Sequence, residues 1–170
     1  YLGKNDTKGP TGTFSKATIK NLNFYNPIIE VEENVSRSIS CAGILAGRGY
    51  GNISNITITN PKIIIRTSKA NTGVLIDQNA VGCLIGILDS YEDPKISEIN
   101  VKSGSITAYN VACVGGLFGR MPAEGGYLVR IYNNTCNLSS ITCNDLTDSG
   151  TVLSAIGGII GYASMEYNKV

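Results

Sequence analysis

The phrase Gly43-Ile44-Leu45-Ala46-Gly47 recurs three more times along the chain. The other copies are Gly82-Cys83-Leu84-Ile85-Gly86, Gly115-Gly116-Leu117-Phe118-Gly119 and Gly157-Gly158-Ile159-Ile160-Gly161. In each copy of this Gly-flanked phrase, two glycines stand four positions apart around a central Leu or Ile. The copies begin 33 to 42 residues apart, and recurrence at about 20–50 residues is typical of solenoids and other repeat arrays.

A second phrase precedes each Gly-flanked phrase and has apolar residues spaced by three and then by two. Its copies are Ile19-x-x-Leu22-x-Phe24, Ile53-x-x-Ile56-x-Ile58, Ile96-x-x-Ile99-x-Val101 and Leu128-x-x-Ile131-x-Asn133. This spacing predicts a turn or bulge followed by a strand with one buried face. A further strand is expected after each copy, beyond a polar corner such as Asn26-Pro27 or Asn60-Pro61. These strands are predicted at Pro27–Val31, Lys62–Thr67, Ser105–Tyr109 and Leu138–Thr142.

These repeats predict an all-β fold, a parallel β-solenoid (β-helix) of about four irregular coils with three short strands each. A β-sandwich of about twelve strands is the alternative, but it gives no reason for one phrase to recur. Residues 1–13 are expected to be a loop or the end of a preceding repeat. Residues 14–170 are expected to form a single repeat-built domain, part of a longer chain or assembly.

Residues of alternating parity in the Gly-flanked phrase predict two columns along the solenoid. The central residues Leu45, Leu84, Leu117 and Ile159 are expected to form an inward stack, with the flanking glycines making room for it. The opposite parity gives a second apolar column, a candidate assembly face formed by Ala46, Ile85, Phe118 and Ile160. Exposed contiguous apolar surface marks interaction sites. The alternatives are a loop that covers this column, or a glycine bulge that turns both parities inward.

The composition argues against several classes of protein. The chain carries 14 basic and 13 acidic residues, a net charge of +1, and no basic cluster, so nucleic acid is not an expected partner. No apolar run reaches the roughly 18–20 residues that cross a bilayer, so this segment is not expected to insert into membrane. The chain has no His, its acidic residues are scattered, and no cofactor, metal or catalytic residue is predicted. We therefore expect no enzymatic activity.

The five cysteines show no Cys-x-x-Cys spacing. Cys41 and Cys113 precede their phrases by two residues and are interpreted as small buried apolar residues. Cys136 and Cys143 enclose a short loop and are the candidate disulfide if the compartment is oxidising. Candidate N-glycosylation sites follow the Asn-x-Ser/Thr rule; they are Asn34, Asn133, Asn137, Asn52, Asn5 and Asn55. If the source is a eukaryote, we expect glycan on Asn34 and Asn133 before Asn55, because stacked Asn ladders are a competing use of Asn55.

The Gly-flanked phrase resembles the GLUG repeat of bacterial and protist surface proteins. Gly115–Gly119 and Gly157–Gly161 are the closest matches to its first part, and Ile53-Ser54-Asn55-Ile56 and Ile96-Ser97-Glu98-Ile99 match its second. The likeness covers most of residues 14–163 and departs from the family at Ile44, Cys83 and the Leu128–Asn133 strand. It implies extracellular display, and it supplies no catalytic residue.

These observations together predict a structural or adhesive extracellular or cell-surface repeat protein that builds an appendage, filament or stalk through stacked coils. Its expected partners are other copies of itself or flanking repeats of the same chain, and surface glycans. The alternative is a carbohydrate- or ligand-binding module, or a non-catalytic arm of a larger secreted protein. Such a module would use tyrosines on loops to stack against its ligand; the candidates are Tyr50, Tyr91, Tyr109 and Tyr127.

Overall fold

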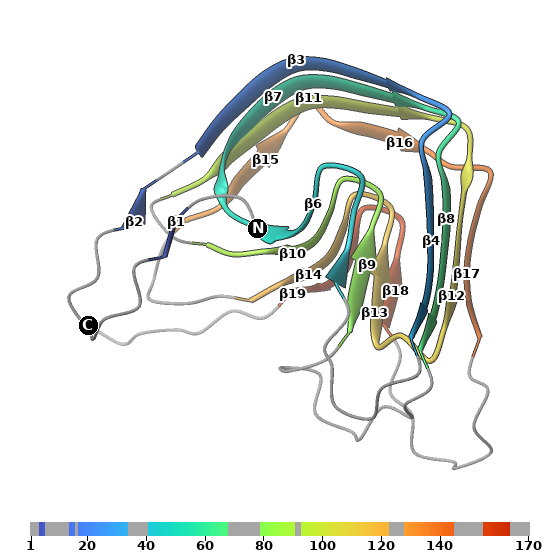
Figure 1. Cartoon of the computed structure of the whole chain (residues 1–170). Coiled ribbons are helices and arrows are strands. Elements are labelled where there is room, and N and C mark those ends of the chain that lie inside the picture. The colour runs from blue at the N-terminus through green and yellow to red at the C-terminus, as the bar shows by residue number, and fades with distance from the viewer. Residues whose placement is uncertain are drawn as a thin grey trace.

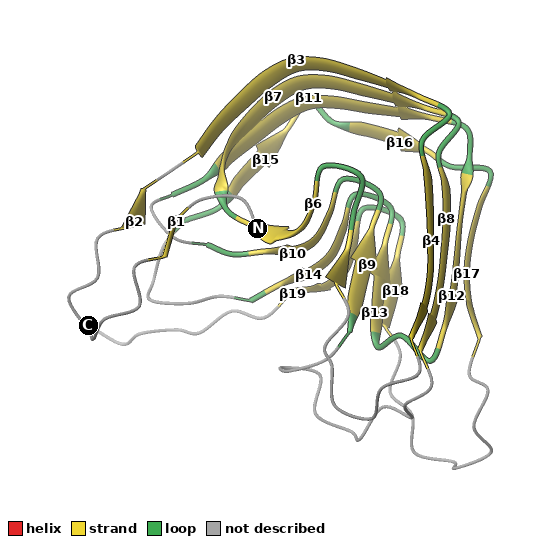
Figure 2. Cartoon of the chain, in the orientation of Figure 1, coloured by secondary structure: helices red, strands yellow, loops and turns green. Residues whose placement is uncertain are grey.

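The computed structural model is a β-solenoid in which parallel strands stack into four sheets (Figure 1). It describes residues 4–5, 14–15, 17–33, 41–67, 79–90, 93–122, 128–144 and 155–163. Strands and short connections make up this described part, and none of it is helical (Figure 2). Consequently it contains no helix of the length and apolarity needed to cross a membrane. The prediction of an all-β parallel solenoid is confirmed.

Two outer sheets meet at a corner. Sheet I has the order β15-β11-β7-β3, with β16 also on β11; its strands are β3 (Ala17–Tyr25), β7 (Gly51–Thr59), β11 (Lys95–Lys102), β15 (Arg130–Tyr132) and β16 (Thr135–Asn137). Sheet II has the order β17-β12-β8-β4; its strands are β4 (Ile28–Glu33), β8 (Lys62–Thr67), β12 (Ser105–Tyr109) and β17 (Ser140–Asn144). Two short strands, β1 (Lys4–Asn5) and β2 (Phe14–Ser15), pair antiparallel outside this stack.

Two inner sheets form a wedge that points into the angle between sheets I and II (Figure 1). Sheet III has the order β18-β13-β9-β5; its strands are β5 (Cys41–Ala42), β9 (Ala80–Gly82), β13 (Cys113–Gly115) and β18 (Ala155–Gly157). Sheet IV has the order β19-β14-β10-β6; its strands are β6 (Ala46–Gly49), β10 (Ile85–Leu88), β14 (Phe118–Met121) and β19 (Ile160–Ala163). We number the coils 1 to 4, as β3–β6, β7–β10, β11–β14 and β15–β19.

Each coil thus contributes to four sheets rather than having the three strands that were predicted, and in coil 4 the part in sheet I is divided into β15 and β16. The difference lies in the Gly-flanked phrase, which was expected to be one strand. Instead the chain bends at its middle, for example at Cys83 and Leu84, and β9 ends before β10 begins. We call this bend the glycine corner; it is the tip of the wedge.

The spacing of three and then two, predicted as a turn or bulge, corresponds to a bend in sheet I: the strands pair residue for residue on both sides of it. The residue at the bend has a left-handed backbone in every coil, with φ of 63° at Asn21, 52° at Asn55, 58° at Glu98 and 55° at Asn133. Asn adopts this conformation more readily than most residues. The corner between sheets I and II uses it again at Asn26 and Asn60. These left-handed positions let sheet I curve over the wedge (Figure 1).

The fourth copy of the spaced phrase was predicted in the wrong register. Ile131 pairs with Ile96, so Ile131 opens the phrase, whereas the sequence had suggested Leu128. The central apolar position is then taken by Asn134, whose side chain receives a hydrogen bond from the N–H of Ile99 at 2.8 Å and donates one to the carbonyl of Ile96 at 3.2 Å. Asn134 therefore joins coil 4 to β11 across the gap between β15 and β16.

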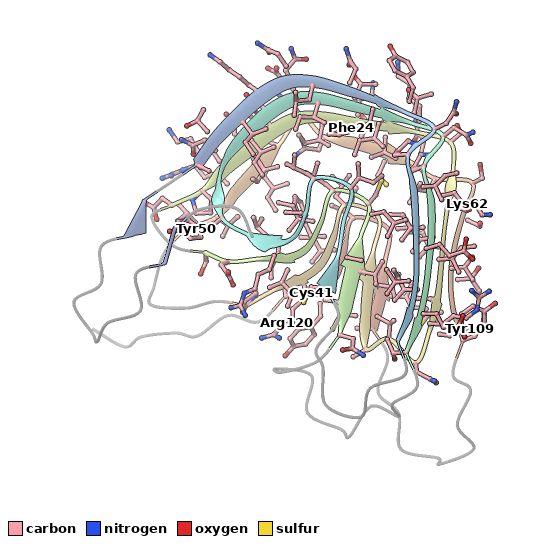
Figure 3. The ribbon with its side chains drawn as sticks, viewed as in Figure 1. Phe24, Cys41, Tyr50, Lys62, Tyr109 and Arg120 are labelled. Carbon is pink, nitrogen blue, oxygen red and sulfur yellow. The ribbon has the colours of Figure 1, made fainter. Side chains whose placement is uncertain are left out.

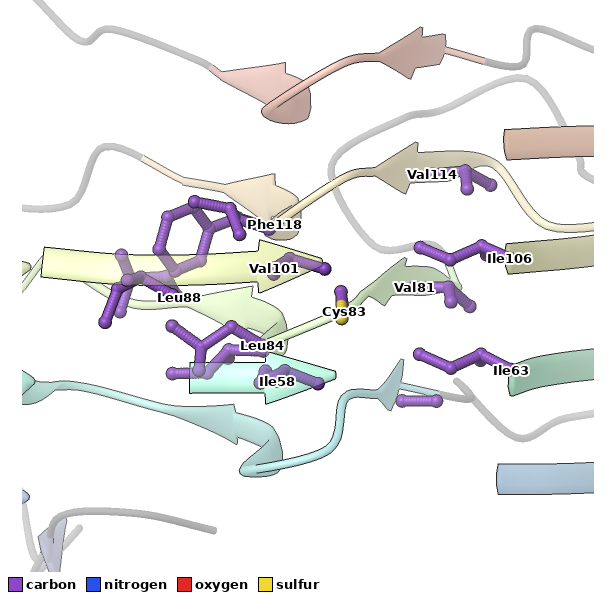
Figure 4. Packing of buried hydrophobic residues seen from close by; sticks show 14 of the residues in the cluster. Ile58, Ile63, Val81, Cys83, Leu84, Leu88, Val101, Ile106, Val114 and Phe118 are labelled. Carbon is purple, nitrogen blue, oxygen red and sulfur yellow. The ribbon is translucent and has the colours of Figure 1, made fainter. Parts of the chain in front are cut away.

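The core fills the space between the wedge and the outer sheets (Figure 4). Ile58 and Val101 come from sheet I, Ile63 and Ile106 from sheet II, and Leu84 from the glycine corner. These side chains are fully buried. Burial of a large aliphatic side chain contributes about 1.5–3 kcal/mol relative to exposure. One coil cannot enclose such a core, so its stability depends on stacking.

Candidate functional site

The glycine corner brings backbone into contact with backbone, which is why glycine recurs there. A Cβ on the first glycine of each copy would collide with the carbonyl oxygen three residues later, as at Gly43, where it would lie 2.6 Å from the oxygen of Ala46. A Cβ on the second glycine would collide with the facing strand of sheet III; at Gly86 it would lie 2.7 Å from the carbonyl oxygen of Ala80. None of these glycines has a left-handed φ. Their role is close approach within the wedge.

The predicted inward stack is confirmed where neighbouring coils cover it. Leu84 and Leu117 are fully buried in the core, and Leu45 packs against them. Backbone hydrogen bonds link Leu45 to Leu84, Leu84 to Leu117 and Leu117 to Ile159. The glycines, however, make room for backbone atoms and not for these side chains.

The predicted assembly face is wrong. Its residues do form a column in sheet IV, because Ile85 pairs with Ala46 and Phe118, and Phe118 pairs with Ile160. But Ile85 and Phe118 are fully buried in the same core as the inward stack, and Ile160 packs against that core. Alternation holds only along a continuous strand, and the bend at the glycine corner turns consecutive residues inward. The alternative of a glycine bulge with both parities inward is therefore correct.

An ion pair that the sequence did not suggest lies on the inner side of the wedge. The guanidinium of Arg48 in β6 donates to both carboxylate oxygens of Asp89, with Nε–Oδ2 and Nη2–Oδ1 distances of 2.9 Å. The Asp89 side chain is fully buried, whereas that of Arg48 is 41% exposed. Asp89 follows β10, and β10 pairs with β6, so two adjacent coils place the partners side by side. A two-pronged geometry of this kind fixes the carboxylate firmly.

Arg120 lies near this pair and is also buried, and its Nε has no hydrogen-bond partner among the residues that the structure describes. It pairs in register with Ile87 on one side and Tyr162 on the other. A small apolar cluster on the inner side of the wedge contains Ile87, Cys113 and Tyr162 together with Ala80, Ala112 and Cys41. Figure 3 shows Cys41 and Arg120 on this side. Burial raises the pKa of the Cys41 and Cys113 thiols, and it outweighs the opposing positive charges of Arg48 and Arg120 at Cys41 and of Arg120 at Cys113.

The cysteines are all free thiols. The candidate disulfide between Cys136 and Cys143 is not present: Cys136 lies in β16 of sheet I, Cys143 lies in β17 of sheet II, and a corner separates them. The Cys143 thiol donates instead to the carbonyl of Val111 at 3.3 Å. Cys113 is fully buried and Cys41 half-buried, and both belong to the apolar cluster inside the wedge. Their interpretation as small apolar residues agrees with this placement.

Burial of Cys113 leads to a testable pH dependence. Burial raises the pKa of its thiol from 9.0 to about 11. Below pH 9 the thiol is protonated in both the folded and the unfolded chain, so its contribution to the free energy of unfolding is fully present. Between pH 9 and pH 11 the unfolded chain releases this proton while the folded chain retains it, and stability should fall by about 1 kcal/mol per pH unit from this group. We expect urea unfolding to show that wild type and Cys113→Ala become closer in stability as pH rises from 9 to 11. A stability difference that stays constant over this range would contradict the prediction.

The candidate glycosylation sites differ in their surroundings. Asn133 and Asn137 are exposed, and Asn52 is half-buried with its Oδ1 accepting the Lys95 N–H at 3.2 Å. Asn55 is exposed, but its amide donates to Oδ1 of Asn21 at 2.8 Å, which is the Asn ladder that competes with glycan. Asn34 and the side chain of Asn5 lie outside the described residues. Glycosylation itself stays a prediction.

The tyrosines proposed as ligand-stacking platforms do not form a common surface within the described part of the chain. Tyr50 is only 1% exposed, so it cannot serve as a platform. Tyr109 lies on the outer side of sheet II (Figure 3), and the Arg66 guanidinium stands 5.1 Å from the centre of its ring. Tyr91 and Tyr127 lie outside the described residues. The described residues contain no group of three or more Cys, Asp or Glu side chains arranged to hold a metal ion.

The resemblance to the GLUG repeat stays a prediction. Its first part corresponds to the glycine corner and its second part to the strands β7 and β11 of sheet I, so both phrases have defined places in the coil. Comparisons with protein-family models, curated proteins and solved structures found no match to this chain.

Proposed function

We propose that this chain is a structural or adhesive extracellular repeat segment, which extends a filament, stalk or surface appendage by stacking its end coils on further coils. The chain serves this purpose without catalysis of its own. The extracellular location is part of the proposal and is supported by the glycosylation sequons and by the GLUG-like phrases.

The observation that carries the proposal is the contrast between the end coils and the middle coils. Leu22 and Val31 in coil 1 are 37% and 36% exposed, whereas Ile56 and Ile65, their partners in coil 2, are fully buried. At the other end, Ile156 is 53% exposed, although its partner Val114 is fully buried. The columns that form the core therefore end in exposed apolar residues at both ends of the stack.

Two physical arguments favour stacking at these ends. An incoming coil would cover the open apolar side chains, each contributing on the order of 0.5–1 kcal/mol for the part that is now exposed. It would also supply partners to the strand edges, whose unpaired backbone groups attract further strands. The outward sides of the middle coils carry polar residues such as Lys62 and Lys102, whereas the exposed members of core-forming columns lie at the two ends.

A matched pair of Ile→Lys variants tests the proposal. Ile159 lies at the end of the stack and is 37% exposed, whereas Ile28 is 67% exposed and pairs with Lys62, so it faces outward from sheet II. Negative-stain imaging and sedimentation velocity should show wild type and Ile28→Lys forming rods of constant width as concentration rises. Ile159→Lys should remain as single particles with an unchanged circular dichroism spectrum. Equal assembly of both variants, or wild type that is monomeric at every concentration, would count against assembly through the end coils.

A further inference from the structure

The hydrogen bonds at the glycine corner all run in one direction. From coil 1 to coil 2, the N–H groups of Ile44 and Leu45 donate to the carbonyls of Cys83 and Leu84 at 2.9 and 3.0 Å. From coil 2 to coil 3, the N–H groups of Leu84 and Ile85 donate to the carbonyl of Leu117. At the glycine corner the earlier coil donates and the later coil accepts, whereas bonds elsewhere in the same junctions also run the other way, as from Lys62 to Pro27.

The junction from coil 3 to coil 4 repeats this pattern. The N–H of Gly116 donates to Gly157 at 3.1 Å, and those of Leu117 and Phe118 donate to Ile159 at 2.8 and 3.0 Å. The corresponding N–H groups of coil 4 belong to Gly158, Ile159 and Ile160. Those of Gly158 and Ile159 donate to no described residue, and the pattern of the earlier coils directs them away from coil 3. We call the glycine corner at this end the donor face.

The opposite end has the complementary chemistry. The carbonyls of Ile44 and Leu45 correspond to the acceptors Cys83 and Leu84 of coil 2, and no described residue donates to them. We call the glycine corner at this end the acceptor face. A donor face meeting another donor face would place N–H against N–H at the corner, whereas a donor face meeting an acceptor face satisfies both.

The position after the first glycine of each phrase differs between the coils. A Cβ at Gly116 would collide with the carbonyl oxygen of Gly158, so coil 4 requires glycine there. Coils 1 and 2 carry Ile44 and Cys83 at this position and are each followed by a coil, so a following coil can also accept a larger residue. A Cβ at Gly158 would meet no described atom within 4 Å.

Side chains at the two ends also match when the register of the stack is continued. Asn133 occupies the same column as Glu98, Asn55 and Asn21, so the Asn21 of an incoming coil 1 would meet Asn133. Asn55 already donates to Asn21 in this way. In a neighbouring column, Cys136 of one copy would meet Phe24 of the incoming coil 1. Within one chain, the neighbour of Phe24 in this column is Ile58, and that of Cys136 is Val101. These pairings favour coil 1 of a second copy as the occupant.

We propose that the donor face binds the acceptor face of a second copy of this chain, head to tail and in register, so that coil 1 of one copy continues coil 4 of the other. This inference rests on the proposed function and adds the partner and the direction. A head-to-tail contact without rotational closure gives an open, polar filament.

Cysteine cross-linking between two separately purified variants tests the direction. Thr142 and Glu30 are exposed and lie in one outward-facing column of sheet II, through Thr107 and Ile64. Stacked strands are about 4.8 Å apart, which is within the roughly 4.4–6.8 Å between Cα atoms that a disulfide spans. A mixture of Thr142→Cys and Glu30→Cys proteins should give a cross-linked dimer, mapped to these positions by mass spectrometry. Neither protein alone should form it.

Ile159→Lys provides the internal control, because Ile159 is 37% exposed at the donor face whereas its counterparts Leu84 and Leu117 are fully buried by the coils that follow them. In the T142C chain it should abolish the cross-link, because that chain contributes the donor face. In the E30C chain it should have no effect, because that chain contributes its acceptor face to the junction. Persistence of the cross-link with Ile159→Lys in the T142C chain would overturn the role of the glycine corner.

The remaining outcomes separate this inference from the proposed function. Homodimers of each variant alone, linked Thr142→Cys to Thr142→Cys, would overturn the direction while leaving stacking through end coils in place. No cross-link, with wild type still forming rods, would overturn the head-to-tail register alone. No cross-link and no rods would overturn both.

Discussion

Gly116→Val is expected to lower the free energy of unfolding by about 3 kcal/mol or more, because its side chain has no space between coils 3 and 4. A Cβ at this position would collide with the carbonyl oxygen of Gly158 and would lie 2.7 Å from Sγ of Cys136. The thiol can rotate, but the carbonyl belongs to a backbone that is hydrogen-bonded to Gly116 itself through the adjacent Gly157. Overpacking of this kind typically costs about 1–3 kcal/mol, and more when backbone must move. Urea unfolding at low protein concentration measures the change.

Gly158→Val is the matched control for this prediction. The same substitution one coil later meets no described atom within 4 Å, so we expect stability within about 0.5 kcal/mol of wild type when the protein is dilute. Equal losses in the two variants would show that the effect belongs to the residue type and not to the contact between coils.

Phe118→Ala is expected to lower the free energy of unfolding by about 3–5 kcal/mol. Phe118 is fully buried in the core, where Figure 4 shows it beside Leu88 and Val101. Removal of a buried aromatic ring loses its transfer free energy and leaves a cavity. Thermal and urea unfolding should both detect the loss, whether or not the protein is assembled.

Ile160→Ala is the comparison for Phe118. Ile160 is the next residue in the same column but is only partly buried, so its loss should be smaller. If Phe118→Ala kept full stability and only prevented assembly, Phe118 would belong to an interface and its placement in the core would be wrong.

The recurring phrases were sufficient to predict the solenoid, because stacked coils need the same side chain at the same place in each coil. They were not sufficient to predict the bend within the Gly-flanked phrase. Parity was used as if Leu84 and Ile85 belonged to one straight strand, but both face the core across the corner. A run of consecutive apolar residues between two glycines, as in Cys83-Leu84-Ile85, is the signal that could have indicated the bend.

The fourth coil shows a different limit of the sequence. The alignment on Leu128 requires apolar residues at the first two positions of the phrase and accepts Asn133 at the third, and it moves the register by three residues. The true phrase, Ile131-x-x-Asn134-x-Cys136, has a polar residue at its centre. Asn134 is acceptable there because its amide replaces backbone hydrogen bonds. No pattern based on apolar residues alone would have found it.

The ion pair of Arg48 and Asp89 was not predictable for a third reason. The two residues are 41 positions apart in the chain and belong to no motif. Only the pairing of β6 with β10 brings them together. The donor and acceptor faces were also missed, because the direction of a backbone hydrogen bond leaves no trace in side-chain identity.

The connection from sheet II to sheet III varies in length while the stack does not change. Twelve residues separate β8 from β9, but only three separate β12 from β13. Ala80 and Cys113 nevertheless stand in the same register, as do Ile63 and Ile106. Chain length at this side is thus uncoupled from the pitch of the coil, and loop closure free energy grows only slowly with length. A foreign peptide inserted between β8 and β9, where the chain already has twelve residues, should be carried on a rigid support, which makes this side of the molecule suitable for presenting epitopes at a regular spacing.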